Sequence, residues 1–252
     1  MAEADLVLLG YGVDDSLQIS VNAQRLLAAT GRAYTLGVPA NLARLLASQR
    51  VETVDLSDRF TLGRRFEDAY LDVAEFLLRR TTEERPVIFL TYGSPLFLNS
   101  LGRFLFVQAR QRNLTVDVRP AISQFDQIVS DLGIDVGAGG LQLFDARRLL
   151  RKRQQLNPAV PLLLLQLAGV QATAVPDDGR PPEPGDYAEI ADYLKAAFGE
   201  EQPVTLLNLA AGDRAATRTT VPLVRFAELV PQIVSTSHLF VEAARTAPPG
   251  KE

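Results

Sequence analysis

Cysteine is absent from this chain of 252 residues, and histidine occurs once, at His238. The absence of cysteine excludes disulfides, thiolate nucleophiles and cysteine-type zinc sites, and it is typical of a protein of the reducing cytoplasm. With one histidine, a metal site would need carboxylates and carbonyls, and a serine-histidine-aspartate triad would have to include His238. We therefore predict a cytoplasmic protein without a metal site.

Long apolar runs and a strong net charge are absent as well. No apolar stretch approaches the roughly 20 residues that cross a bilayer, and residues 1–5 lack the basic region of a signal peptide. The formal net charge of -4 argues against a general nucleic-acid surface, and acidic residues flank the arginine pairs at 64–65 and 79–80. The expectation is a protein with neither a membrane nor a nucleic acid as its partner.

Residues 87–102 form the stretch around which the chain is organised. Four apolar residues are followed by a break at Gly93 and Pro95 and then by helical periodicity, which predicts a buried strand, a tight loop and a helix. Ligands of open α/β sheets bind at the loop after such a strand. Gly93 lets a backbone approach a ligand without an intervening Cβ, and Pro95 fixes the turn. An ordinary strand-to-helix connection is the alternative that this stretch leaves open.

Strands and helices alternate along the chain, which predicts an α/β fold with a parallel sheet in a first domain, residues 1–132. Strands are expected there at 5–9, 34–38, 51–56, 87–90 and 115–118, and helices at 16–29, after Pro39, and at 64–80, 98–111 and 124–131. A glycine-rich connection at 133–140, a candidate for a hinge or a cleft edge, opens a second α/β domain, residues 133–245. Its strands are expected at 141–144, 161–167, 204–208 and 237–241, and its helices at 146–155, 186–198 and 223–233. Residues 246–252 are expected to be a disordered tail.

The loops after three strands, at Gly10, Tyr92 and Leu167, are expected to wall a cleft between the two domains. They carry no cluster of cysteine, histidine or paired carboxylates. Chemistry in this cleft should need little side-chain acid or base, as when a cofactor brings its own leaving group. A sulfonium methyl donor fits, because its methyl group is already activated and the protein has only to align the reacting atoms.

The stretch from Pro120 to Ala146 resembles the tetrapyrrole-methylase superfamily of S-adenosylmethionine-dependent enzymes. Its turn at residues 120–123, its Asp-Leu-Gly-Ile-Asp run, the following glycines and its Gln-Leu-Phe-Asp-Ala segment are most similar to the borosin peptide-backbone N-methyltransferases. Residues 92–95 stand where the superfamily has a Gly-Asp-Pro or Gly-His-Pro loop, and Ser235 and Thr236 resemble the borosin C-terminal Ser-Thr. The resemblance runs from Asp5 to about Ala243.

This resemblance implies an α/β fold of two domains with a cofactor cleft between them, and S-adenosylmethionine as the cofactor. It also implies a precursor peptide as the substrate, methylated on backbone amides, and a homodimer. Residues 98–106 carry more apolar surface than one sheet face requires, which favours the homodimer, and burial within the monomer is the open alternative. The residues that the resemblance places against the cofactor are Gly93, Ser94, Pro95, Leu96, Phe97, Ile122, Ser123, Gln142, Leu143, Leu167 and Ala210.

Borosins place an arginine four residues before a tyrosine on the helix that precedes the central strand. Tyr70, Arg65 and Arg64 occupy that region here, and the resemblance implies that Tyr70, assisted by Arg65 or Arg64, deprotonates or orients the acceptor. The spacing departs from the family, because residue 66 is Phe, and a plain core tyrosine is the alternative. Ser94 also stands where the superfamily has Asp or His.

Two other functions stay open. One is a methylase of a tetrapyrrole or another small molecule. The other is a catalytically degenerate member that binds a peptide or a partner without turnover, which the altered arginine-to-tyrosine spacing suggests. The ending around His238 resembles that of diphthine synthases, with the histidine displaced by one position. Because a displaced residue on a strand points to the opposite face, we expect a structural role for His238.

Overall fold

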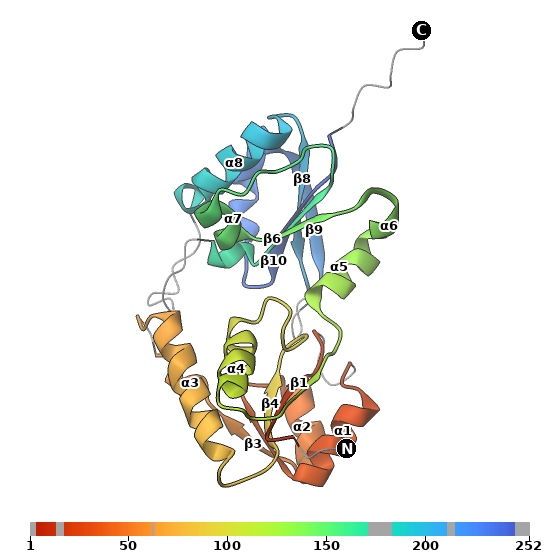
Figure 1. Cartoon of the computed structure of the whole chain (residues 1–252). Helices are drawn as coiled ribbons and strands as arrows, with labels where there is room; N and C mark the ends of the chain where they lie inside the picture. Colours follow the sequence, from red (N-terminus) through yellow and green to blue (C-terminus); the bar gives the residue numbers. More distant parts are fainter. Residues whose placement is uncertain (1–3, 14–17, 62, 171–182, 211–214, 245–252) are drawn as a thin grey trace. The chain divides into compact units, whose positions relative to one another are not determined.

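The computed structural model describes residues 4–13, 18–61, 63–170, 183–210 and 215–244. The chain forms two compact units, Met1–Asp131 with Thr173–Asp177 and Leu132–Ala172 with Asp178–Glu252 (Figure 1). In the described part of the chain, each unit holds a five-stranded sheet. None of the described helices has the length and apolar character that crossing a membrane requires.

The sheet of the first unit is parallel throughout, in the order β3-β2-β4-β1-β5. Its strands are β1 (Leu6–Gly10), β2 (Arg32–Thr35), β3 (Glu52–Asp55), β4 (Val87–Thr91) and β5 (Val116–Arg119). The helices between and after them are α1 (Val21–Thr30), α2 (Ala40–Ser48), α3 (Phe66–Arg80), α4 (Ser100–Gln111) and α5 (Gln124–Leu132). This alternation is the α/β fold that the sequence predicts.

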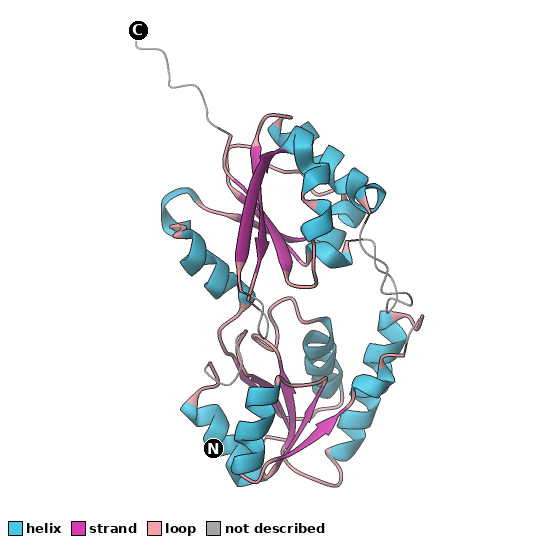
Figure 2. Ribbon diagram, turned by 180° about the vertical axis from the view of Figure 1, so that it is seen from behind, coloured by secondary structure: helices cyan, strands magenta, loops and turns pink. Residues whose placement is uncertain are grey.

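Helices cover both faces of this sheet, and the alternation of side chains along β1 shows why. Leu6 and Leu8 belong to a core shared with α3 and α4, whereas Val7 and Leu9 belong to a core shared with α1 and α2. All four side chains are at most 2% exposed. Burying each one contributes about 1.5–3 kcal/mol relative to leaving it in water. A central parallel strand is therefore apolar at every position, and Figure 2 shows the strands of the unit flanked by helices.

The strand order creates a topological switch point between β1 and β4. The connections from β1 to β3 use α1 and α2 on one face of the sheet, whereas those from β3 to β5 use α3 and α4 on the other. The chain thus leaves the neighbouring strands β1 and β4 toward opposite faces. In open α/β sheets a ligand-binding crevice forms at such a point, outside the carboxyl ends of the strands.

The second unit has a mixed sheet in the order β6-β7-β10-β8-β9. Only β6 and β7 are parallel among its described pairs, and the other neighbours are antiparallel. The strands are β6 (Gln142–Asp145), β7 (Leu162–Leu165), β8 (Pro203–Asn208), β9 (Thr217–Pro222) and β10 (Ser237–Val241). The helices α7 (Ala146–Lys152) and α8 (Ala188–Phe198) share one apolar core with the sheet, and α6 (Val136–Gly139) precedes β6.

Two helical segments differ from the sequence-based expectation. The first helix begins at Val21 because Ser20 is its N-cap, with Oγ accepting the Ala23 N–H at 3.1 Å, whereas the expected cap, Ser16, lies outside the described residues. The glycine-rich connection 133–140 contains the short helix α6, because Asp135 accepts the Gly137 N–H at 2.9 Å. A polar side chain at an N-cap thus decides where each helix begins.

The end of the second unit also differs. Residues 223–233 form two 3-10 helices, Leu223–Glu228 and Val230–Gln232, because one α-helix would need the backbone N–H that Pro231 lacks. The strand β9 was not expected at all. The predicted disordered tail at 246–252 lies outside the described residues.

The apolar residues of α4 pack inside the first unit. Leu101 and Leu105 are 2% and 0% exposed, and Phe104 and Phe106 pack against the same core. The excess apolar surface that favoured a homodimer is therefore used within one chain, and the oligomeric state stays a prediction.

Candidate functional site

The loops after β1 and β4 meet at the switch point of the first unit. Gly12 and Gly93 form an antiparallel bridge in which the Gly93 N–H donates to the Gly12 carbonyl at 2.8 Å. Just before it, the Tyr11 N–H donates to the Thr91 carbonyl at 3.0 Å. Two of the loops that the sequence singles out are thus held together by backbone hydrogen bonds.

Gly10 is the point where three loops come into contact. A Cβ at Gly10 would lie 2.3 Å from the Gly93 carbonyl oxygen, 2.9 Å from the Ala121 Cβ and 3.1 Å from the Pro95 Cδ. These neighbours belong to the loops after β4 and β5. Gly93 itself has a φ of 63°, in the left-handed region that favours glycine. The three loops can therefore approach this closely only because residue 10 has no side chain.

The segment from Tyr92 to Asn99 is held in place by Asn99 and Gly102, which were not predicted from the sequence. The Asn99 side chain accepts the Gly102 N–H at 2.8 Å, as the N-cap of α4, and donates to the Thr91 Oγ at 2.8 Å. A Cβ on Gly102 would fall 2.0 Å from the Pro95 carbonyl oxygen. A glycine within a helical pattern is the signal that could have indicated this close approach.

The loop after β5 carries the expected capping box. Ser123 is 6% exposed, its Oγ donates to the Asp126 carboxylate at 2.6 Å, and its N–H donates to the same carboxylate at 2.7 Å. A hollow of ≈ 370 Å³ beside it is lined by Ala121, Ile122, Asp126, Gln127 and Ser130. This hollow lies next to the loop contact at Gly10, because Ala121 takes part in both.

Apolar side chains are exposed around these loops. Tyr92, Leu96 and Ile122 are 37%, 39% and 43% exposed, and the Phe97 and Phe125 ring centroids lie 6.1 Å apart. Among the residues that the sequence predicts to bind the cofactor, the structure thus gathers seven on the loops after β4 and β5, namely Gly93, Ser94, Pro95, Leu96, Phe97, Ile122 and Ser123. This edge offers a ligand backbone groups and apolar surface.

The other four predicted residues belong to the second unit and do not all lie at one edge of its sheet. Leu167 and Ala210 follow the carboxyl ends of β7 and β8, which run in the same direction. Gln142 and Leu143 lie at the amino end of β6, where Gln142 pairs with Leu162. The Gln142 amide donates to the carbonyls of Asn157 and Val160, both at 2.8 Å. Cofactor contacts from these four residues stay a prediction.

The predicted catalytic residues lie at the amino-terminal end of α3. Tyr70 is half-buried on the core of the first unit, with ring centroids 5.6 Å from Phe60 and 6.0 Å from Phe66. Arg65 is exposed and pairs with Glu67 at 2.6 Å. Arg64 donates to the Asp72 carboxylate at 3.3 Å and to the Arg59 carbonyl at 2.9 Å. The catalytic role of these residues stays a prediction.

The start of α3 nevertheless lies toward the carboxyl edge of the sheet, as such a role requires. The connection of residues 81–86 joins the end of α3 to the amino end of β4, so α3 runs back along the sheet. Its first turns, with Tyr70, therefore lie toward the carboxyl edge, where the Gly93 loop is.

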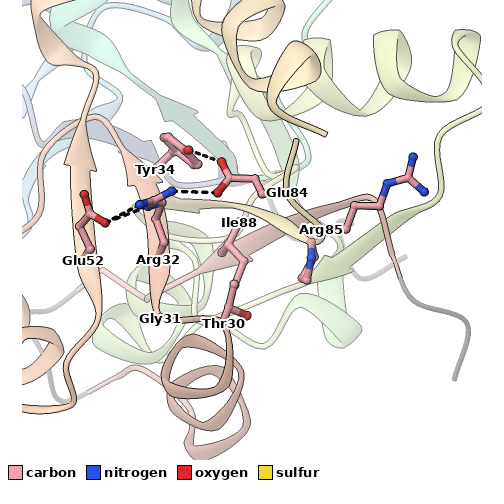
Figure 3. Close-up of a pocket in the computed structure, with 9 residues that line it drawn as sticks. Thr30, Gly31, Arg32, Tyr34, Glu52, Glu84, Arg85 and Ile88 are labelled. Carbon is pink, nitrogen blue, oxygen red and sulfur yellow. Dashed lines mark hydrogen bonds and ion pairs between the residues drawn. The ribbon is translucent and has the colours of Figure 1, made fainter. Parts of the chain in front are cut away.

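A second hollow, of ≈ 310 Å³, lies at the opposite, amino-terminal edge of this sheet (Figure 3). Arg32 donates to Glu52 at 2.9 Å and to Glu84 at 3.1 Å, and the Tyr34 hydroxyl donates to Glu84. Burial, together with the hydrogen bond to Glu84, raises the pKa of Tyr34 to about 12. The phenol is therefore protonated at neutral pH, and this network ties β2, β3 and the connection before β4 together.

The described residues hold no group of three histidine, cysteine or acidic side chains that could bind a metal ion. The arrangement at the carboxyl edge is a close set of glycine-containing loops with apolar surface around it. Such a site can hold and orient a ligand through shape and backbone hydrogen bonds, while an acid or base would have to come from the few polar side chains nearby.

Comparison with known proteins places the chain in a family. The family model described as Tetrapyrrole (Corrin/Porphyrin) Methylases matches residues 5–220. The chain is 26% identical over 211 residues to a methyltransferase/ribosomally synthesized type I borosin cyclic peptide precursor of Serendipita vermifera subsp. bescii, covering 82% of the chain and 50% of that protein. It is 22% identical over 249 residues to another of Mycena rosella, covering 96% and 61%. The chain thus spans between half and two thirds of the length of these relatives.

Solved structures agree on the fold. Uroporphyrin-III-C-methyltransferase from Thermus thermophilus matches with a TM-score of 0.67 and 17% identity, covering 95% of this chain and 92% of that one. A structure of the enzyme with S-adenosyl homocysteine matches with a TM-score of 0.63 and 19% identity, covering 95% and 97%. Because the family model covers most of the sequence and the fold agrees over nearly all of it, the chain belongs to the tetrapyrrole (corrin/porphyrin) methylases.

Proposed function

We propose that the chain is an S-adenosylmethionine-dependent methyltransferase that N-methylates backbone amides of a ribosomally made precursor peptide. The observation that carries the proposal is the meeting of the β1 and β4 loops at the switch point, in a chain of this family. The peptide acceptor is supported by the relatives, whose names combine a methyltransferase with a ribosomally synthesized cyclic peptide precursor.

The residues at the carboxyl edge of the first unit fit the cofactor. Gly10 lets the loops after β4 and β5 pack against the end of β1, whereas a Cβ at Gly93 would meet only Val13 Cγ1, at 3.8 Å, so the backbone at Gly93 is the part that a ligand can approach. Exposed Leu96 and Ile122 offer apolar contacts, and Ser94 offers a hydroxyl. S-adenosylmethionine supplies, when bound, a methyl group that its positive sulfur has already activated. The task left to the chain is to orient the acceptor and to exclude water.

Tyr70 is assigned the remaining chemical task. A peptide amide is a poor nucleophile because its nitrogen lone pair is delocalised into the carbonyl, so the nitrogen has to be oriented and its proton removed. A tyrosine accepts that proton only as its phenolate, and a neighbouring cation that lowers the phenol's ordinary pKa of ~10 increases the fraction present as phenolate. The proposal assigns Arg64 as this cation. Its guanidinium donates to the carboxylate of Asp72, which follows Tyr70 by two residues on α3.

A second candidate is a methylase of a tetrapyrrole or another small molecule. The observation that favours it is the family model, which describes Tetrapyrrole (Corrin/Porphyrin) Methylases and matches residues 5–220. Mass spectrometry separates the two. The purified chain is incubated with S-adenosylmethionine that carries a deuterated methyl group, either with peptides rich in apolar residues or with uroporphyrinogen III.

Peptide N-methylation predicts a labelled methyl group on a backbone nitrogen, which tandem fragmentation locates. A label on the tetrapyrrole alone would replace the first candidate with the second. Cofactor binding without transfer to either acceptor would favour a degenerate, peptide-binding member of the family.

A further inference from the structure

His238 lies at the start of β10, next to the turn that follows β7. Its side chain is 0% exposed, and its Nδ1 accepts the backbone N–H of Gln166 at 3.2 Å. β10 is antiparallel to β7, with Leu239 opposite Leu164, so the contact joins the first part of β10 to the carboxyl end of β7. The histidine is therefore bonded to a loop, and not only packed in a core.

Gln166 has an unusual backbone conformation. Its φ of 58° and ψ of 43° are left-handed, which is costly for a residue other than glycine. It precedes the short 3-10 helix Leu167–Gly169, in which the Gly169 N–H donates to the Gln166 carbonyl at 3.1 Å. The direction of the Gln166 peptide thus determines where Leu167 and the following residues lie.

The hydrogen bond at Nδ1 shows which tautomer of the imidazole is present. Because Nδ1 accepts a hydrogen bond, the proton of the neutral ring is on Nε2. Nε2 is buried and has no hydrogen-bond partner among the described residues. Burial also lowers the pKa of His238 to about 4, so the ring is neutral at physiological pH. A buried donor without a partner is costly, which argues that the acceptor at Nδ1 is the reason for having histidine here.

We propose that His238 is a positioning residue for the cofactor: by accepting the Gln166 N–H, it holds the left-handed residue and the Leu167–Gly169 turn in the shape that binds S-adenosylmethionine. The proposal rests on the proposed function, because Leu167 is one of the predicted cofactor contacts. It assigns to His238 no contact with the cofactor and no proton transfer.

Three variants separate positioning from plain packing, with S-adenosylhomocysteine as the calorimetric probe. His238→Leu removes the acceptor, so the free loop relaxes until water bonds the Gln166 N–H. Returning the loop to the binding shape then leaves this N–H unsatisfied and should weaken binding by about fivefold or more. His238→Asn keeps an acceptor in the position of Nδ1 and should bind within about threefold of the wild type. Val241→Ala makes a cavity at the far end of the same strand, where Val241 pairs with Leu162, and should lower the melting temperature without changing the affinity.

A spectroscopic readout covers the case in which His238→Leu does not fold. The chain has one histidine, so selective ¹⁵N-histidine labelling of the protein without a polyhistidine tag gives a single imidazole, and a second, uniformly ¹⁵N-labelled sample shows the Gln166 amide. We expect the Nε2-protonated tautomer, slow hydrogen exchange at the Gln166 amide, and shifts of both on addition of S-adenosylhomocysteine.

A ring protonated on Nδ1, or imidazole and amide signals that stay unchanged at saturation, would overturn the proposal. So would wild-type affinity in a folded His238→Leu. Absence of any binding to the wild-type chain would instead defeat the cofactor assignment itself, so the two failures are distinguishable.

Discussion

Gly10→Ala tests whether the loop junction is as close as the structure shows. Gly10 ends the buried strand β1, and an added Cβ would lie 2.3 Å from the Gly93 carbonyl oxygen. Ordinary van der Waals contact begins at 3.4 Å, so this carbonyl would have to retreat by about 1 Å. Ala121 and Pro95, at 2.9 and 3.1 Å, restrict any movement of the new methyl group to the other side.

The sign of the effect on stability follows from two opposing contributions. On an unobstructed strand, replacing glycine with alanine stabilises by about 0.5–1 kcal/mol, because the unfolded chain loses freedom. Overpacking a close contact costs about 1–3 kcal/mol. We expect the clash to win because a backbone carbonyl has to move, which gives a net loss of about 1–2 kcal/mol. A displacement of about 1 Å at the Gly93 loop should also weaken cofactor binding by at least about tenfold.

Urea unfolding measures the first effect and calorimetry with S-adenosylhomocysteine the second. Gly139→Ala is the matched control, because a Cβ there would meet no atom within 4 Å and φ is not in the left-handed region. The control should retain wild-type affinity and equal or greater stability. If Gly10→Ala were as stable as the wild type and bound the cofactor equally well, the three loops would not meet as described.

Three further predictions concern single side chains. Asn99→Ala removes the N-cap contact to Gly102 and the hydrogen bond to Thr91. Urea unfolding should show a free energy of unfolding lower by about 1–2 kcal/mol, whereas Asn99→Asp should retain most of the stability from the cap. Burial lowers the pKa of His238 from 6.5 to about 4, so the unfolded chain binds more protons than the folded one between these pH values. The free energy of unfolding should therefore fall by about 3 kcal/mol as the pH drops from 6.5 to 4. His238→Leu should lack this part of the fall, and parallel stability-versus-pH curves for the two proteins would contradict the assignment. Tyr70→Phe should preserve packing and cofactor affinity while lowering turnover about 10²-fold, and full turnover would make Tyr70 a core residue.

The elements of the first unit were predictable because their signals are local. Val87 to Leu90 form an apolar run that is followed by a glycine at Gly93, and such a run indicates a strand buried on both faces. The capping box of Ser123 and Asp126 likewise lies within four residues. These patterns do not depend on where the rest of the chain lies.

The strand β9 could not be recognised in the same way. Residues Thr217–Pro222 lack apolar alternation, because most of the strand is exposed at the edge of the sheet. Only the pairing with β8, Thr217 opposite Asn208, makes it a strand. Pairing of that kind is decided by tertiary context and not by propensity.

The site shows the same division. Sequence reasoning found Gly10 and Gly93 as loop residues, but their contact joins positions that are 83 residues apart in the chain. The support from Asn99 and Gly102, and the bond between His238 and Gln166, depend on the packing of whole elements. The sequence therefore predicts which loops carry the site, whereas the structure is needed to show what holds them.

Calorimetric titration of the purified chain with S-adenosylhomocysteine tests the central claim most directly. A methyltransferase of this family predicts saturable heat from one site per chain, with a dissociation constant between about 1 µM and 1 mM, and an increase in melting temperature at saturation. Absence of both heat and thermal shift at millimolar ligand would contradict the assignment of the carboxyl-edge loops to a cofactor, and with it the proposed methyltransferase activity.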